Sequence, residues 1–192
     1  MSVILQSLGR TVAAGIVLLL IILVAFGQGL TNGTAHITGL RWLHAASGLM
    51  WVGLLWYFNF VQIPSMPKIP DEQKPAIGKV IAPTALFWFR WAALATVVTG
   101  LLVALGGGFL VMALSLQAPF RGIGIGMWLA LLMAFNVWFI IWPNQKKALG
   151  MVQVEPDVKA KAARLAMLTS RFNTMLSFAM LYCMIAQHNG GL

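Results

Sequence analysis

Two histidines in apolar surroundings are the residues of this chain best suited to bind a metal. His44 lies in LRWLHAASGLMWVGLLWYFNFVQIPSMP (residues 40–67), and His188 lies close to the end of the sequence. An imidazole in so apolar a stretch either bonds a neighbouring helix or ligates a metal. Imidazoles from two helices at one depth are typical axial ligands of haem b, which has no covalent anchor. The pair predicts haem b ligation, with Met184, one turn before His188, as an alternative ligand.

The elements that position these residues are predicted to be membrane-spanning helices. Of the 192 residues, 60% are hydrophobic and 9% are charged, whereas a soluble domain carries about a quarter charged residues. So little polar surface predicts an integral membrane protein. A helix needs roughly 20 apolar residues to cross the hydrocarbon layer. Five stretches meet that requirement, giving an all-α bundle with helices at about 11–29, 40–63, 84–107, 123–143 and 157–188.

The positive charges predict the orientation of these five helices. With five crossings, the N-terminus and the even-numbered connections share one side, and that side holds eleven of the thirteen Lys and Arg residues. Only Arg41 and Arg121 fall on the other side. The positive-inside rule then places the N-terminus in the cytoplasm and the C-terminus in the periplasm of a bacterial inner membrane. The net charge of +9 is therefore a topology signal and an attraction for anionic lipid, with nucleic acid a poor candidate partner.

This orientation puts the two histidines on the same side of the membrane as the two isolated arginines. Both His44 and His188 come about one turn below the periplasmic surface, so Arg41 and Arg121 are placed to meet haem propionates. A periplasmic electron carrier would approach the haem from this side. Residues 106–122 are too short for another crossing, and we predict that they end a helix and lie at the same interface. No internal repeat is present, and we predict one membrane domain over residues 1–192.

Helical spacing predicts that two of the helices bring polar stripes to the bundle interior. One stripe starts at His44 and recurs every three or four residues to Gln62, and the other runs from Ser170 to His188. Such stripes are unfavourable toward lipid. Near the cytoplasmic side the helices also carry a second polar group, which comprises Asn59, Gln62, Arg90, Asn136, Asn144, Gln145, Arg171 and Asn173.

Arg90, in LFWFRWAALA, supports two hypotheses. Its side chain either snorkels to the interface while packed against Trp88 and Trp91, or reaches Asn59 and Asn136 to form a site for an anion or a purine-like molecule. No catalytic serine or cysteine set is present, and no Asp or Glu lies in the interior of a crossing, which argues against a proton-driven carrier. The lone Cys183 cannot form an internal disulfide, and no C-x-x-C-H motif attaches a c-type haem.

Three segments of the chain resemble a known family. They are WLHAASGLMWVGLLWYFNFVQIP, NVWFIIWPNQKKALG and TSRFNTMLSFAMLYCMIAQH, and they are similar to the membrane domain of the urate oxidase N-terminal family. The family is best known from bacterial membrane urate hydroxylases with a fused cytochrome c. The resemblance implies an all-helical bundle linked to electron transfer to cytochrome c, with urate oxidation in the fused members. It assigns His44 and His188 to the family's histidine positions, Asn144 and Gln145 to W-P-N-Q, and Arg171 and Asn173 to S-R-x-N.

The sequence departs from the family pattern in two places, and these leave two hypotheses. No cytochrome c domain follows before Leu192, and Phe172 stands where the family pattern has histidine after Ser-Arg. The first hypothesis is a haem b redox protein that works with a separate cytochrome c, on urate or a similar purine. The second is a non-catalytic accessory or assembly subunit of a larger respiratory or photosynthetic membrane complex.

Overall fold

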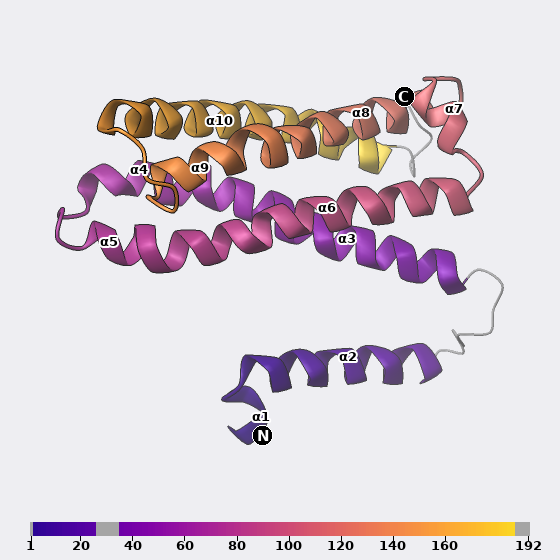
Figure 1. The fold of residues 1–192 in the computed structure, drawn as a ribbon. Coiled ribbons are helices and arrows are strands. Elements are labelled where there is room, and N and C mark those ends of the chain that lie inside the picture. The colour runs from indigo at the N-terminus through magenta and orange to yellow at the C-terminus, as the bar shows by residue number, and fades with distance from the viewer. Residues whose placement is uncertain (1, 26–34, 187–192) are drawn as a thin grey trace. The chain divides into compact units, whose positions relative to one another are not determined.

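The computed structural model describes residues 2–25 and 35–186, and within these residues the only regular elements are helices (Figure 1). Contacts divide the chain into two compact units, Met1–Gly39 and Leu40–Leu192, which we describe separately. His188 lies outside the described residues, as do residues 26–29 of the predicted first crossing.

The first unit consists mainly of the short helix α1 (Ser2–Leu5) and the helix α2 (Leu8–Ala25). The Thr11 hydroxyl donates to the carbonyls of Ile4, at 3.2 Å, and Ser7, at 3.0 Å, and so ties the start of α2 to α1. No residue of α2 is buried, and the helix is long and apolar enough to cross a membrane. Beyond Arg10 and Thr11 the exposed surface of α2 is apolar, which suits contact with lipid.

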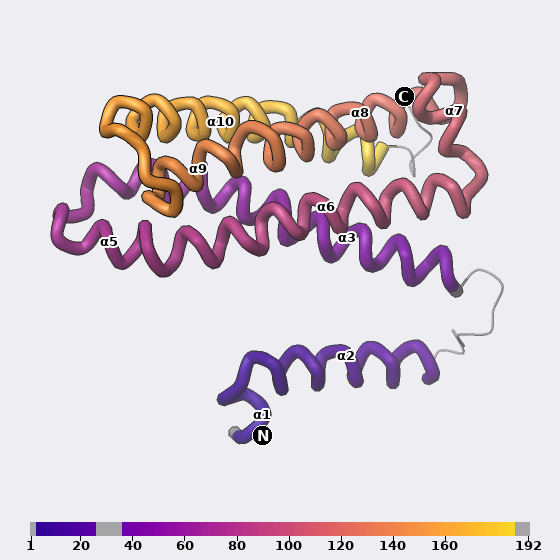
Figure 2. Tube along the Cα trace, viewed as in Figure 1, coloured from indigo at the N-terminus to yellow at the C-terminus, as the bar shows by residue number. Residues whose placement is uncertain are grey.

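The second unit is a bundle of long helices whose neighbours along the chain run antiparallel (Figure 2). Three of them are broken into consecutive helical elements without leaving the helical path. The elements are α3 (Ala35–Trp56), a π-helix (Tyr57–Gln62), α4 (Ile63–Ser65) and a 3₁₀ turn (Met66–Lys68); α5 (Lys74–Ala76), a π-helix (Ile77–Ile81) and α6 (Ala82–Gly106); α7 (Leu110–Leu114); α8 (Arg121–Phe135), a π-helix (Asn136–Ile141) and α9 (Trp142–Ala148); and α10 (Pro156–Ala186).

Among residues 2–25 and 35–186, four stretches are long and apolar enough to cross a membrane, and they correspond to four of the five predicted crossings. They are Leu8–Ala25, His36–Lys68, Lys74–Gly106 and Arg121–Ala148. The predicted fifth crossing is the 31-residue helix α10, which is not among them. Polar residues lower the average hydropathy of α10, since Arg171, Asn173 and several hydroxyl side chains lie in its second half.

The three π-helical segments share one cause. Each ends two residues before a proline, at Pro64, Pro83 and Pro143. A proline inside a helix has no N–H to donate, and its ring clashes with the carbonyl of the preceding turn. Widening that turn by one residue relieves the clash while the helix continues. The proline spacing could have predicted these segments from the sequence.

The core of the bundle forms where the predicted inward faces meet. Trp51 and Leu55 of α3, Phe89 of α6 and Met133 of α8 are all at most 2% exposed. Trp51 and Leu55 belong to the stripe predicted to begin at His44, so that stripe faces inward as expected. The polar stripe on α10 is also buried at its three hydroxyl positions, Ser170, Thr174 and Ser177.

Residues 107–120 fold back against the start of α8. The rings of Phe109 and Phe120 stack with centroids 5.0 Å apart, and the Trp128 indole N–H donates to the Leu114 carbonyl at 3.0 Å. A side chain at Gly124 would bring its Cβ to 2.0 Å from the Ala113 carbonyl oxygen. The backbone of α8 at Gly124 therefore contacts the backbone of α7 at Ala113, and residues 107–120 close one end of the bundle.

Substituting Gly124 by alanine should destabilise the bundle by roughly 1–3 kcal/mol or more, because the new methyl group meets a backbone atom that cannot rotate away. Thermal denaturation of the detergent-purified protein, followed by circular dichroism, measures the effect. Gly53→Ala is the matched control, since its methyl group would have no heavy atom within 4 Å. A Gly124→Ala protein that melts at or above the wild-type temperature would contradict the close backbone contact.

Candidate functional site

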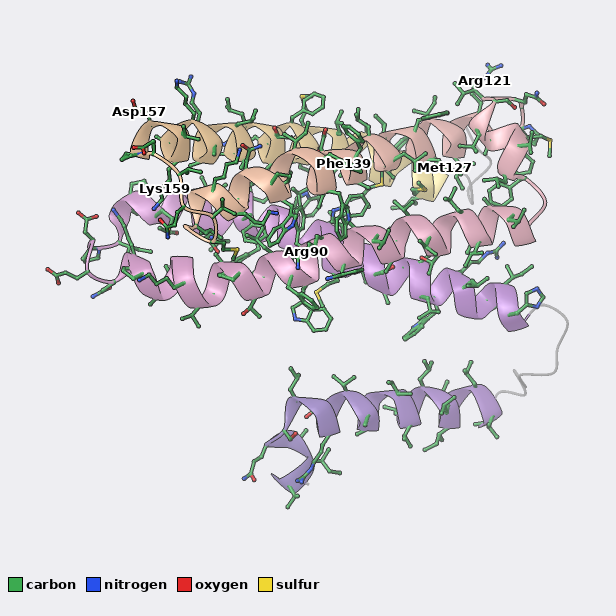
Figure 3. All side chains as sticks on the ribbon, in the orientation of Figure 1. Arg90, Arg121, Met127, Phe139, Asp157 and Lys159 are labelled. Carbon is green, nitrogen blue, oxygen red and sulfur yellow. The ribbon has the colours of Figure 1, made fainter. Side chains whose placement is uncertain are left out.

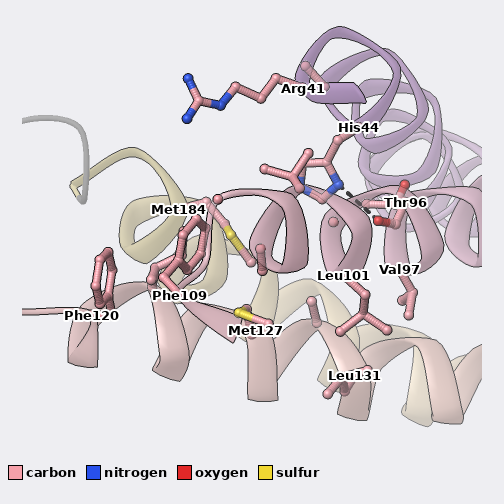
Figure 4. A pocket seen from close by; sticks show the side chains of 17 residues that line it. Arg41, His44, Thr96, Val97, Leu101, Phe109, Phe120, Met127, Leu131 and Met184 are labelled. Carbon is pink, nitrogen blue, oxygen red and sulfur yellow. Dashed lines mark hydrogen bonds between the residues drawn. The ribbon is translucent and has the colours of Figure 1, made fainter. Parts of the chain in front are cut away.

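A cavity of about 530 Å³ opens between α3, α6, α8, α10 and the turns on either side of α7 (Figure 4). This volume falls in the range of small-molecule and cofactor sites, about 300–1,000 Å³. The lining is mostly aliphatic, aromatic and thioether, and its polar side chains are Arg41, His44 and Thr96. The predicted ligand His44 therefore lines this cavity.

Hydrogen bonding fixes the orientation of the half-buried His44 imidazole. Its Nδ1 lies 2.9 Å from the Thr96 carbonyl oxygen, and because a carbonyl only accepts, Nδ1–H is the donor (Figure 4). The Thr99 hydroxyl is 3.5 Å from the same nitrogen but donates to the Ala95 carbonyl at 2.6 Å. In the neutral imidazole, Nε2 then carries the lone pair. A backbone carbonyl on the other ring nitrogen is the usual outer partner of a metal-ligating histidine.

Gly100 provides the space that the imidazole occupies. A Cβ at this position would lie 2.7 Å from His44 Cε1 and 3.0 Å from Nδ1, closer than side-chain atoms approach one another. The sequence analysis identified His44 but neither Gly100 nor Thr96. A glycine in a membrane helix indicates close packing. It does not indicate which side chain packs there, so only the structure connects Gly100 to His44.

The opposite wall of the cavity comes from α8 and α10 and includes Met127 and Met184. Met184, the predicted alternative ligand, thus lines the same cavity as His44. Gly126 allows α10 to approach α8, because a Cβ there would lie 3.0 Å from the Cβ of Cys183 and 3.4 Å from the Met184 methyl group.

The two predicted propionate partners differ in their placement. Arg41 lines the cavity one turn before His44, and in Figure 4 its exposed guanidinium extends past the imidazole. Arg121 does not line the cavity. It is at the start of α8, where its Nε donates to the Leu116 carbonyl at 3.2 Å, and Figure 3 shows it at the opposite end of the bundle from Asp157.

Within the described residues, the cavity lacks the set of donor side chains that a bare metal ion needs. Among residues 2–25 and 35–186, no group of three or more His, Cys, Asp or Glu side chains could hold a metal. An iron porphyrin brings four nitrogen ligands and needs only axial ligands from the protein. One imidazole with a free Nε2 and one thioether fit that requirement.

Two members of the second predicted polar group, Asn59 and Asn136, each form a buried hydrogen bond with a residue of α10. Asn59 Nδ2 donates to Ser170 Oγ at 2.8 Å and to the Leu55 carbonyl at 2.9 Å. Asn136 Nδ2 donates to Asn173 Oδ1 at 2.8 Å, and Asn173 Nδ2 donates to the Met133 carbonyl at 2.9 Å. These hydrogen bonds hold the helices together, although the side-chain oxygen of Asn59 is buried without a hydrogen-bond partner.

The remaining members of this polar group are not hydrogen-bonded to the two pairs, although Ser170 of the first pair lines a small cavity together with Gln62 and Gln145. Asn144 donates to the Ile140 carbonyl at 2.8 Å, and Arg171 is exposed. Gln62 and Gln145 line a small separate cavity of about 50 Å³. The Gln62 side-chain oxygen is buried there without a donor.

Arg90 does not reach the asparagines. Its guanidinium carbon lies 3.7 Å from the centre of the Trp142 ring and 5.6 Å from that of Phe87. The rings that meet it are therefore not Trp88 and Trp91, which the snorkelling hypothesis named. Residues one or two positions apart do not face each other on a helix, whereas residues three apart do.

Replacing Asn173 or Asn136 by leucine should each destabilise the protein by about 1–3 kcal/mol, because the partner amide stays buried without its hydrogen bond. The double variant should lose less than the sum, with a coupling of about 0.5–3 kcal/mol. Unfolding of the purified protein in mixed detergent measures all three free energies. Strictly additive losses would show that the two amides do not depend on each other.

Comparison with known proteins gives a family match over part of the chain. Residues 107–192 match the family model described as urate oxidase N-terminal. This confirms the resemblance seen in NVWFIIWPNQKKALG and TSRFNTMLSFAMLYCMIAQH, while the segment that contains His44 lies outside the matched residues. No curated protein and no solved structure matches the chain. The matched part comprises α7 to α10 and supplies the cavity wall that includes Met184.

Proposed function

Starting from the urate oxidase N-terminal family match over residues 107–192, we propose that this chain is a membrane haem b protein that passes electrons to a separate cytochrome c. The observation that carries the proposal is the His44 imidazole. Its Nδ1 is bonded to the Thr96 carbonyl and its Nε2 is free, at the edge of a cavity of about 530 Å³.

The residues around the cavity fit haem b in size, polarity and charge. His44 would ligate the iron, and Met184 or His188 would be the second axial ligand. The largely apolar lining suits a porphyrin, and Arg41 is positioned to pair with a propionate. Haem supplies one-electron transfer when bound. The residues of this chain orient it, exclude water from its faces and neutralise its acidic edge.

We infer that α10 is a fifth crossing, although its average hydropathy is lower than that of the other four stretches. Its polar residues Ser170, Asn173, Thr174 and Ser177 are buried against neighbouring helices, so they do not meet lipid. The exposed side chains of its second half include Phe178, Tyr182 and Ile185. The exposed surface of the second half of α10 is thus more apolar than the average hydropathy of the helix indicates.

The ends of the bundle differ in charge, and this supports the proposed orientation. In Figure 3 Lys159 lies near one end of the bundle and Arg121 lies at the other. The connections near Lys159 also carry Lys68, Lys74 and Lys146. We therefore infer that the Lys159 end is cytoplasmic and that the cavity opens near the periplasmic side. A periplasmic cytochrome c is the partner that this position suits, and a purine of the urate type is the proposed electron donor.

An optical spectrum of the purified protein tests the haem proposal. Protein from haem-replete cells should show a Soret band, and His44→Ala should abolish it. Gly100→Ala should reduce it strongly, because its methyl group displaces the imidazole without removing a ligand. His36→Ala is the control, since this exposed histidine lies in the other compact unit. Met184→Ala and His188→Ala identify the second ligand by which one changes the spectrum of the reduced protein.

Each variant is also checked by gel filtration, so that loss of haem is separated from loss of folding. A wild-type protein that stays colourless in haem-replete cells would overturn the proposal. If that colourless protein purified together with a large complex, the accessory-subunit hypothesis would replace it.

The electron donor is tested separately. Membranes that contain the haem-loaded protein should reduce added cytochrome c when urate is supplied, and membranes that contain His44→Ala should not. The absorbance of reduced cytochrome c measures the rate. If haem is bound but urate gives no reduction above the variant, the redox role stands and urate is excluded as the donor.

A further inference from the structure

Arg90 is an unpaired cation within the bundle, at a site separate from the large cavity. Among residues 2–25 and 35–186 the only ion pair joins Lys74 and Asp71, and Arg90 makes no hydrogen bond. Figure 3 shows Arg90 on α6, between the two ends of the bundle. An arginine inside a membrane segment normally pairs with an acid or reaches the interface. In the part of the chain that the structure describes, no acid pairs with Arg90.

A second cation comes to the same indole ring. The Lys146 ammonium lies 5.7 Å from the centre of the Trp142 ring, which the Arg90 guanidinium contacts at 3.7 Å. Two positive charges from different helices are thus held over one aromatic side chain, although like charges repel. A bound anion would turn this repulsion into attraction, and a guanidinium offers paired N–H donors that match a phosphate.

Helix length indicates that this site lies at the membrane boundary. Lys74–Gly106 has 33 residues and Arg121–Ala148 has 28, whereas the hydrocarbon layer needs roughly 20. Counted from their Gly106 and Arg121 ends, about 20 residues bring the cytoplasmic boundary near Phe87 on one helix and Trp142 on the other. Arg90 is then about one turn inside that boundary, within reach of a lipid phosphate.

The surroundings of the two cations suit the acyl chains of the same lipid. Trp88 is 53% exposed and Trp91 45% exposed, and both stand on α6 next to Arg90. Trp91 meets Trp138 edge to face at 5.4 Å, and the indole N–H of Trp138 is buried without an acceptor. Aromatic side chains at this level are typical of the interface between headgroups and hydrocarbon.

We propose that Arg90, Lys146 and Trp142 form a binding site for the phosphate of an anionic phospholipid. The guanidinium and the ammonium bind the phosphate, and the indole positions both cations. The exposed tryptophans contact the acyl chains. The site requires that the bundle cross a membrane, but it does not depend on haem at His44.

Native mass spectrometry of the detergent-purified protein, titrated with phosphatidylglycerol, tests this proposal. The wild-type protein should bind phosphatidylglycerol more tightly than phosphatidylcholine. Arg90→Gln should weaken phosphatidylglycerol binding by at least about tenfold, since hydrogen bonds to charged groups contribute this much or more. Trp142→Leu should also weaken it, although both cations remain. Arg164→Gln is the matched control, an exposed cation on α10 that contacts no aromatic ring, and should bind as the wild type does.

Competition and a conservative variant separate lipid binding from the binding of soluble anions and from misfolding. Inorganic phosphate and glycerol 3-phosphate should not compete with the lipid; competition at equal concentration would show a site for soluble anions and overturn the proposal. Arg90→Lys keeps the charge and should retain intermediate binding, which guards against a folding defect in Arg90→Gln. Equal phosphatidylglycerol affinity in wild type and Arg90→Gln would also overturn it. Binding should persist in His44→Ala, so failure of the haem proposal leaves this result intact.

Discussion

The polar face of α10 is the constraint on which the arrangement of the bundle depends. It makes four hydrogen-bonded contacts with other helices: Ser170 with Asn59, Asn173 with Asn136 and with the Met133 carbonyl, and Ser177 with the Trp56 indole N–H at 2.9 Å. No water competes for these groups inside an apolar bundle, so each must find its partner in another helix. Interhelical hydrogen bonds of this kind contribute about 0.6 kcal/mol each on average. Their larger effect is to select one register of α10 against its neighbours.

That register determines what α10 brings to the large cavity. Met184 follows Ser177 by two helical turns on the same face, so fixing the hydroxyl also fixes the thioether in depth and direction. The opposite wall is fixed independently, because the Thr96 carbonyl holds the His44 ring and Gly100 leaves room for it. Hydrogen bonds of α10 therefore fix the wall that includes Met184. The wall that includes His44 is fixed by the Thr96 carbonyl and by the space at Gly100.

The prolines make a separate contribution to the same geometry. Each of the three π-helical segments adds one residue to a turn and thereby rotates the part of the helix beyond it. Asn59 and Asn136 both lie within such segments, where widened turns redirect the side chains relative to a regular helix. π-helical turns occur frequently at functional positions. Here they aim two amides at α10, so the same prolines that disturb α3 and α8 help to position the helix that completes the cavity.

The sequence by itself determined the helical class, four apolar stretches of membrane-spanning length, the inward faces of α3 and α10, and the family match of the second half. These features are local, since composition and a period of 3.6 residues express them within a single helix. The sequence also identified His44 and Met184, which line one cavity. It predicted in addition that the asparagines belong to one polar group near the same side of the bundle.

Only the tertiary structure decided the partners. Trp142 rather than Trp88 or Trp91 meets Arg90, Asn136 bonds Asn173 rather than Arg90, and Arg121 turns to the Leu116 carbonyl instead of the cavity. Gly100 became significant only when the ring that occupies its missing side chain was located. Helical periodicity in the sequence predicts which face of its own helix a residue occupies. Which residue it meets depends on the register and rotation of the neighbouring helix, and those follow from all the packing and hydrogen-bond contacts together.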